Sequence, residues 1–499
     1  MSSHAPHEDR RLPAPPENHA PGQHPAQQPH RPPLTLLPPA ARVLDIIAVV
    51  AALLATTVVV TGGFREWTPF GRLSLTSWLR PALVALFAAA VRAYLWPRQP
   101  LPLRVGHAIL RWWHRDDTRA VLPIFLTTRV GVLIVGFLSV IVLGYGPPTG
   151  PPWRVYTNEF LNLPARFDAG WYLGIASQGY QWSSAAASGQ QNIVFFPAYP
   201  LLVRYASLLV ARQTMWAGVL ISLGAFFVAL VYIHRLARER LREDQATAAI
   251  TFLAAYPFAL FYSAPYSESL FLLAMTGACY HFARDDLWQA AVWALIAGFT
   301  RPNGCLLSIV LGLMLLTRVR RDLGTDWRQW PFARYADRVA IAVLPGLGLI
   351  TYSTYIYFLT GDPLQWSKQQ VGWGRAYRGL DNLVTDRVNF INTRGFYDYA
   401  STQTIDMFYG LAVVLCLVSV WPVFRRFGLP FAVLVLANLL PPLATGGLLS
   451  MGRMTSVLFP TFLWLGAAVP ADYRSSVTIA FAMLQALCAA MFFTWRPMF

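Results

Sequence analysis

Residues 164–200 read PARFDAGWYLGIASQGYQWSSAAASGQQNIVFFPAYP, and the predicted topology of the whole chain depends on this stretch. It combines the carboxylate of Asp168 with Arg166, many aromatic residues and several Gly and Pro residues. It continues to Arg212 and has long apolar runs on both sides. These apolar runs indicate the class of protein to which the chain belongs.

The composition is strongly apolar. Of 499 residues, 55% are hydrophobic, 14% are aromatic and only 13% are charged. Runs of roughly 18 or more apolar residues recur from Arg42 to the C-terminus, and each could cross about 30 Å of hydrocarbon as a helix. An ordinary soluble globular protein is therefore excluded, and we predict an all-α polytopic membrane protein.

We expect about 13 transmembrane helices from these runs. They lie at roughly 42–63, 79–96, 121–144, 214–233, 245–263, 266–283, 286–300, 303–317, 339–360, 405–424, 429–449, 453–469 and 476–495. The region 286–317 fits either two short helices or one broken helix.

Arginine placement sets the predicted orientation. Lys and Arg number 40 against 24 Asp and Glu, a net charge of +16. In a soluble chain this excess would suggest a nucleic-acid partner. Here the basic residues gather in the short connections 97–120, 234–244 and 318–338, which favours topology signalling and contact with membrane lipid headgroups. We therefore expect no nucleic-acid partner. With these connections in the cytoplasm, the N-terminus lies on the cytoplasmic side of the cell membrane and the C-terminus on the outer side.

The same orientation decides the interpretation of residues 195–212. Counting FFPAYPLLVRYASLLVAR as a span would move the basic connection 234–244 outside, and its two prolines, short apolar length and Arg204 favour a helix along the interface. Residues 145–213 then form one outer loop, partly membrane-embedded. A second outer loop, 361–404, contains GDPLQWSKQQVGWGRAYRG, whose aromatic and polar residues suit a sugar or lipid headgroup, or equally an interfacial aromatic belt.

Three regions are expected along the chain. Residues 1–41 are rich in Pro and His and lack an apolar core, which predicts a disordered cytoplasmic tail. Residues 42–120 should hold two N-terminal transmembrane helices and a basic cytoplasmic loop, and residues 121–499 the main membrane domain. The four cysteines lie within apolar runs without metal-ligand spacing, and we interpret them as core residues.

Few outer residues could carry chemistry, and none of them is a histidine. On this topology His107, His114, His234 and His281 lie on the inner side, so an outer Ser-His-Asp or His-rich zinc site is excluded. A carboxylate is then the candidate general base. Asp168 is the best one, because Phe167 and Trp171 can lower its local dielectric. A structural or headgroup-contacting role fits a lone Asp about as well.

Three more charged residues lie at expected outer helix ends. Glu268 in PYSESLF either binds substrate or stabilises a helix dipole. Arg301 in TRPNG interrupts an apolar run, which suggests an anionic phosphate partner, with snorkelling to the outer surface as the alternative. Arg453 in SMGRMTSVLFP occupies a similar position. Together with Arg166, these arginines could form an anion-binding pocket.

Five motifs, taken in order, resemble one family. RFDAGWYLGIASQGY, FFPAYPLL, PYSESLF, TRPNG and SMGRMTSVLFP are similar to segments of the PIG-V family, the GPI mannosyltransferase and its bacterial relatives, within the GT-C class of membrane glycosyltransferases. The resemblance covers roughly residues 121–470. It implies a GT-C-like fold, a polyprenyl-phosphate sugar donor, usually mannose, and Asp168 as the catalytic base. The family's Trp-Asp pair is here Phe167-Asp168.

These observations predict an inverting mannosyltransferase with its active site on the outer face, acting on a lipid, glycan or protein acceptor. We assign Arg166, Arg301 and Arg453 to the donor phosphate, and Trp171, Tyr172 and Tyr180 to the sugar. We expect no metal cofactor because the loop lacks an Asp-x-Asp cluster, although a divalent ion could bridge Asp168 and phosphate. The alternatives are a transporter or lipid flippase, and a non-catalytic scaffold.

Overall fold

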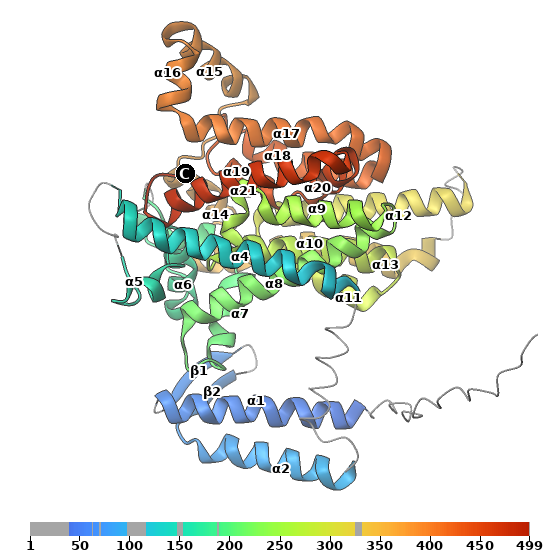
Figure 1. Cartoon of the computed structure of the whole chain (residues 1–499). Helices are drawn as coiled ribbons and strands as arrows, with labels where there is room; N and C mark the ends of the chain where they lie inside the picture. The colour runs from blue at the N-terminus through green and yellow to red at the C-terminus, as the bar shows by residue number, and fades with distance from the viewer. Residues whose placement is uncertain are drawn as a thin grey trace, which may run out of the picture.

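A computed structural model describes residues 39–61, 63–68, 71–96, 116–146, 153–186, 189–324 and 332–498. Nearly all of the expected N-terminal tail, residues 1–38, lies outside the described residues, as does most of the expected basic loop, residues 97–115. The described part is a bundle of long helices that run in similar directions (Figure 1). The prediction of an all-α polytopic fold is confirmed, apart from one small hairpin.

The hairpin lies between the first two helices. Helix α1 (Pro39–Thr61) and helix α2 (Leu79–Leu95) are joined by the antiparallel strands β1 (Phe64–Thr68) and β2 (Gly71–Leu75). The two helices pack against each other at one side of the molecule (Figure 1). A buried ion pair joins them, with Arg92 Nε 3.1 Å from the Asp45 carboxylate. The strands correct the all-helical prediction for these residues.

Six helical segments of the described residues are long and apolar enough to cross a membrane. They are α4 (Asp116–Leu143), α8 (Thr214–Arg238), the 3-10 turn η4 (Pro302–Leu306) with α12 (Leu307–Leu323), α13 (Ala336–Thr360), α17 (Thr404–Phe427) and α21 (Ala471–Phe493). A seventh is formed if α9 (Glu243–Ala255) and η3 (Pro257–Ser263), bent by 77°, count as one broken span.

Shorter apolar helices fill the spaces between these spans. They are α10 (Glu268–Ala283), α11 (Leu287–Thr300), α18 (Leu429–Leu443) and α20 (Phe459–Ala468), with α19 (Met451–Ser456) before the last and η6 (Phe332–Tyr335) before α13. Each predicted apolar run contains a helix, so the positions of the runs are confirmed. How many of them cross the bilayer stays a prediction.

The two expected outer loops fold into short helices. The first contains α5 (Glu159–Asn162), α6 (Ala169–Gln178), η1 (Ser184–Ala186), η2 (Asn192–Val194) and α7 (Ala198–Ser207). The second contains α14 (Gln365–Lys368), η7 (Gln369–Trp373), α15 (Leu380–Arg394) and α16 (Phe396–Thr402). Helices α5, α6, α14 and α16 lie toward one end of the bundle, on the left of Figure 1, and the end of α12 and the start of α13 lie at the other. Because α7 has only 10 residues, it is too short to span, as predicted.

Two buried side chains donate hydrogen bonds to the backbone carbonyls at the break between α9 and η3. Arg129, from the middle of α4, donates hydrogen bonds of 2.7 Å to the Ala254 carbonyl and 2.6 Å to the Ala259 carbonyl. Gln485 of α21 donates to the carbonyls of Ala254 (3.0 Å) and Tyr256 (2.8 Å). In hydrocarbon no water can bond these carbonyls. The two side chains therefore hold η3 where it leads into α10.

Replacing Arg129 with Leu should destabilise the protein by about 3 kcal/mol, because the buried Ala259 carbonyl loses this donor and the Ala254 carbonyl keeps only Gln485. Thermal unfolding of the purified protein in detergent measures this loss as a lowered midpoint. Val130→Ala is the control, because Val130 is the next residue on α4 and is 49% exposed. Equal midpoints for the two variants would contradict the role given to Arg129.

Candidate active site

A cavity of about 1010 Å³ lies between the two segments that the sequence predicts to be outer loops, which keep the names first and second outer segment below. Its walls come from the turn before α6, residues 190–196, η4, residues 366–377, the end of α18 and the start of α19. Of the predicted site residues, it is lined by Asp168, Trp171, Tyr172, Arg301 and Arg453. Tertiary folding thus brings together residues that lie up to 285 positions apart in the chain.

Asp168 is held in a tight turn at the start of α6. Phe167, before it, has a left-handed backbone with φ 45°, which is unusual for a residue with a side chain. The hydroxyl of Tyr266 accepts a 3.0 Å hydrogen bond from the Asp168 amide and donates one of 3.1 Å to the Arg166 carbonyl. The Asp168 carboxylate makes no capping bond to α6. It is 7% exposed and lines the cavity instead.

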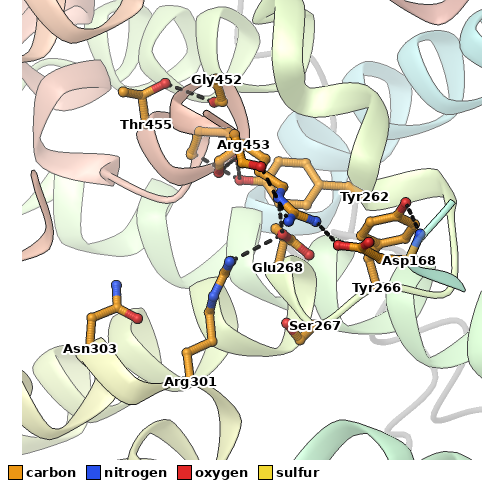
Figure 2. A network of polar contacts seen from close by, with 12 residues as sticks. Asp168, Tyr262, Tyr266, Ser267, Glu268, Arg301, Asn303, Gly452, Arg453 and Thr455 are labelled. Carbon is orange, nitrogen blue, oxygen red and sulfur yellow. Dashed lines mark hydrogen bonds and ion pairs between the residues drawn. The ribbon is translucent and has the colours of Figure 1, made fainter. Parts of the chain in front are cut away.

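Arg453 connects the two carboxylates of the site. Its Nη1 lies 2.5 Å from Asp168 Oδ2, and its Nε lies 3.8 Å from Glu268 Oε1 (Figure 2). Glu268 is fully buried and also pairs with Arg301, whose Nη1 is 3.1 Å away. Asp168, Arg453, Glu268 and Arg301 therefore form one chain of alternating charges, in which Glu268 lies behind the cavity and the other three line it.

Glu268 and Arg301 each occupy the local position that the sequence suggested. Glu268 is the first residue of α10, so its charge also faces the positive end of that helix. Arg301 is an extended residue between α11 and η4, where Pro302 ends the apolar helix. Its pairing with Glu268 makes snorkelling to the surface unnecessary.

Close packing of α19 places Arg453. A Cβ atom on Gly452 would lie 2.4 Å from the Phe258 ring of η3, so only glycine permits this approach. Tyr262 of η3 also donates a 2.9 Å hydrogen bond to the Ser456 carbonyl. The bent segment α9–η3 thus packs against α19 and places Arg453 next to the turn that holds Asp168.

Arg375, in the second outer segment, is a site residue that the sequence did not single out. It lines the cavity beside the predicted groups. Burial, and then repulsion from Arg453 and Arg301, lower the pKa of its guanidinium to about 10, and Asp168 acts in the opposite direction. The group stays charged at neutral pH in a position that an added anion would stabilise. Nothing in the pattern around it distinguishes it from the other arginines of residues 361–404.

The part of the cavity around Asp168 and Arg453 carries more positive than negative charge. Three arginines, Arg301, Arg375 and Arg453, face two carboxylates, Asp168 and Glu268. Lys368 also lines the cavity, but Asp362 lies 2.5 Å from its amine. One positive charge is therefore left unbalanced, and in a partly desolvated site it is stabilised best by an anion.

Aromatic side chains line the cavity beside Asp168. Trp171 stacks on Phe195, with ring centres 6.0 Å apart, and Trp373 meets both edge-on at 5.2 Å. The Tyr172 hydroxyl lies 2.7 Å from Ser267 Oγ, beside the first residue of α10. Flat apolar faces of this kind suit the C–H surfaces of a sugar ring.

Two predicted site residues point elsewhere. Arg166 is fully buried and donates to the carbonyls of Phe493, Asn162 and Ala165, so it holds the Asp168 turn against α21 and does not line the cavity. The Tyr180 hydroxyl donates a 2.7 Å bond to the Phe195 carbonyl behind the cavity wall. The assignments of Arg166 to a donor phosphate and of Tyr180 to a sugar are therefore corrected to supporting roles.

Metal ligands do not cluster in the described residues. There, no three His, Cys, Asp or Glu side chains come close enough together to hold an ion.

Known proteins resemble the chain in two ways. Residues 152–370 match the family model described as mannosyltransferase (PIG-V), which confirms the predicted resemblance over this part and supports glycosyltransferase activity. A crystal structure of the Archaeoglobus fulgidus oligosaccharyltransferase in complex with Zn and sulfate is similar at 12% identity and a TM-score of 0.35. The match covers 72% of this chain and 53% of that one, so this chain spans about half of its length. No curated protein matches the sequence.

Proposed function

Because residues 152–370 match the mannosyltransferase family, we propose that the chain is an inverting mannosyltransferase with Asp168 as its base. In this proposal the donor is a polyprenyl-phosphate mannose and the acceptor is a hydroxyl on the outer side of the cell membrane. The observation that carries it is the pairing of a buried carboxylate, Asp168, with a cavity whose arginines exceed its carboxylates.

The charge balance supports a phosphodiester donor. A sugar linked to a polyprenol through one phosphate carries a single negative charge, which equals the charge left unbalanced by Arg301, Arg375 and Arg453. A sugar linked through a diphosphate would bring a further negative charge into a site that also holds Asp168 and Glu268. The monophosphate donor therefore fits the site better.

Arg453 links donor binding to activation of the base. Its guanidinium lies 2.5 Å from Asp168 Oδ2. A donor phosphate competes for this guanidinium and frees Asp168, while Glu268 keeps Arg301 and Arg453 in place.

The chemical step is a single displacement at the anomeric carbon of the sugar. Asp168 takes the proton of the acceptor hydroxyl, and the hydroxyl oxygen forms a bond to the anomeric carbon from the face opposite the phosphate. The bond from that carbon to the phosphate oxygen breaks, and its electron pair goes to the phosphate. The configuration inverts, and the arginines stabilise the phosphate as it gains a second negative charge.

The proposed orientation has the cavity outside. Basic residues near the ends of α8, α12 and α13 lie away from the cavity: Arg235, Arg238, Arg318, Arg320, Arg321 and Arg338. Short basic connections stay in the cytoplasm. This arrangement supports an outer active site and a cytoplasmic N-terminus.

The test is transfer by the purified protein in liposomes supplied with radiolabelled polyprenyl-phosphate mannose and an extract of cell-envelope acceptors. We expect labelled acceptor and released polyprenyl phosphate in equal amounts. Cys305 reports donor binding separately, because it lines the cavity half-buried while Cys279, Cys416 and Cys488 are buried. The donor should protect Cys305 from maleimide. No transfer, with label crossing the bilayer instead, would favour a transporter or flippase.

Arg375→Gln should raise the KM for the donor about tenfold or more, since a hydrogen bond to a charged group contributes about 1.5 kcal/mol or more. The rate at saturating donor should change less. Arg378→Gln is the matched control, because Arg378 lies three residues away but is 53% exposed and pairs with Asp386. A donor KM that is equal in both variants would remove Arg375 from the phosphate site.

A further inference from the structure

A second cavity, of about 680 Å³, adjoins the first on the other side of the Asp168 turn. Phe167 and Trp171 line both cavities, so their side chains form the partition between them. Both are half-buried. Asp168, between them in sequence, lines only the first cavity. A ligand in the second cavity would therefore have one end at the partition, next to the residue proposed as base.

We propose that this second cavity binds the acceptor, and that the acceptor is an uncharged carbohydrate. The inference rests on the proposed function and adds to it the class of the second substrate. A transferase needs two substrates next to one base, and the charged groups of the first cavity are matched by the donor phosphate. The second cavity lies next to the Asp168 turn and is separate from the groups that the donor phosphate would meet.

The charge of the second cavity is what separates an acceptor from the anionic donor. Its one charged lining residue, Arg154, lies 2.7 Å from Glu159, which neutralises it. No positive charge is left over, in contrast to the site around Arg453. An uncharged molecule therefore fits here, and the donor phosphate is directed to the first cavity.

The walls suit a polyhydroxyl chain. Trp153 and Trp171 offer aromatic faces, and Ser177, Gln178 and Thr214 offer hydroxyl and amide groups. Ser177 and Gln178 are exposed. Only Val155 and Leu173 are aliphatic among the lining residues, too few to hold a lipid chain.

Two glycines of α6 open the floor of this cavity. A Cβ atom on Gly170 would lie 3.1 Å from the Trp153 ring, whereas one on Gly174 would meet nothing within 4 Å. A side chain at Gly174 can therefore begin in open space and project into the cavity. This position allows the cavity to be blocked while the fold is kept.

The experiment measures transfer from polyprenyl-phosphate mannose to mannotriose by the full-length protein and by Gly174→Leu. We expect the KM for mannotriose to rise tenfold or more in the variant, with the donor KM and the protection of Cys305 unchanged. Gln178→Ala should raise the same KM by a smaller factor. Gly224→Leu is the control, because a Cβ there also meets nothing within 4 Å and Gly224 is exposed on α8.

The other outcomes separate the acceptor site, the acceptor class and the proposed function. An unchanged KM for mannotriose in Gly174→Leu would overturn the second cavity as the acceptor site. Transfer to membrane lipids or proteins, with none to mannotriose, would overturn the carbohydrate class. No transfer by the unaltered protein to any acceptor would instead refute the proposed function itself.

Discussion

Replacing Asp168 with Asn should lower the rate of sugar transfer by about 10²–10⁴-fold, the contribution typical of a positioned general base. Asparagine keeps the size of the side chain but cannot take the proton of the acceptor hydroxyl. It also no longer competes for Arg453, which lies 2.5 Å from the carboxylate. The donor should therefore bind as well as, or better than, it does to the unaltered protein, and a loss of rate with intact binding is specific to a base.

Two measurements check this expectation. Transfer kinetics give the rate, and protection of Cys305 from maleimide gives the affinity for the donor. Asp386→Asn is the matched control, because Asp386 is a carboxylate of the second outer segment that is 46% exposed and pairs with Arg378. Transfer by Asp168→Asn at more than half the rate of this control would remove Asp168 from the base role.

Removing the charge of Arg453 should impair both folding and activity. Arg453→Met leaves Asp168 without its 2.5 Å partner and leaves Glu268 with Arg301 alone. Breaking a buried ion pair by removing one partner costs about 3–5 kcal/mol. We expect a lower unfolding midpoint in detergent and a fall in kcat/KM for the donor of about 10³-fold, because the phosphate also loses a guanidinium partner.

A second substitution separates the two effects. Arg453→Met combined with Asp168→Asn removes the carboxylate that the first substitution leaves without its partner, so the unfolding midpoint should recover in part while transfer stays low. Arg453→Lys keeps the charge but loses the planar fork that reaches both carboxylates, and should fold normally with an intermediate rate. Recovery of transfer in the double variant would contradict the roles given to Asp168 and Arg453.

Hydropathy alone was enough to predict the helical part of the fold. A span must be apolar along its whole length because hydrocarbon offers its backbone no other partner, so each span leaves a local signal in the sequence. Hydropathy did not decide residues 195–212: the placement of the basic connections, with two prolines and Arg204, predicted an interfacial helix there, and α7 is a 10-residue helix. Charges that interrupt such runs are costly, which is why Glu268, Arg301 and Arg453 could be singled out.

The direction of each side chain depended on tertiary contacts. Arg166 and Asp168 are two residues apart, yet the left-handed turn at Phe167 and the Tyr266 hydroxyl send one into the core against α21 and the other into the cavity. The role of Arg375 arises because its segment lines the same cavity as Arg301 and Arg453, which no local pattern records. By itself, the sequence determined which segments are helical and which charges are expensive; only the tertiary structure decided which of those charges meet, because long-range packing and not local propensity sets the distances between them.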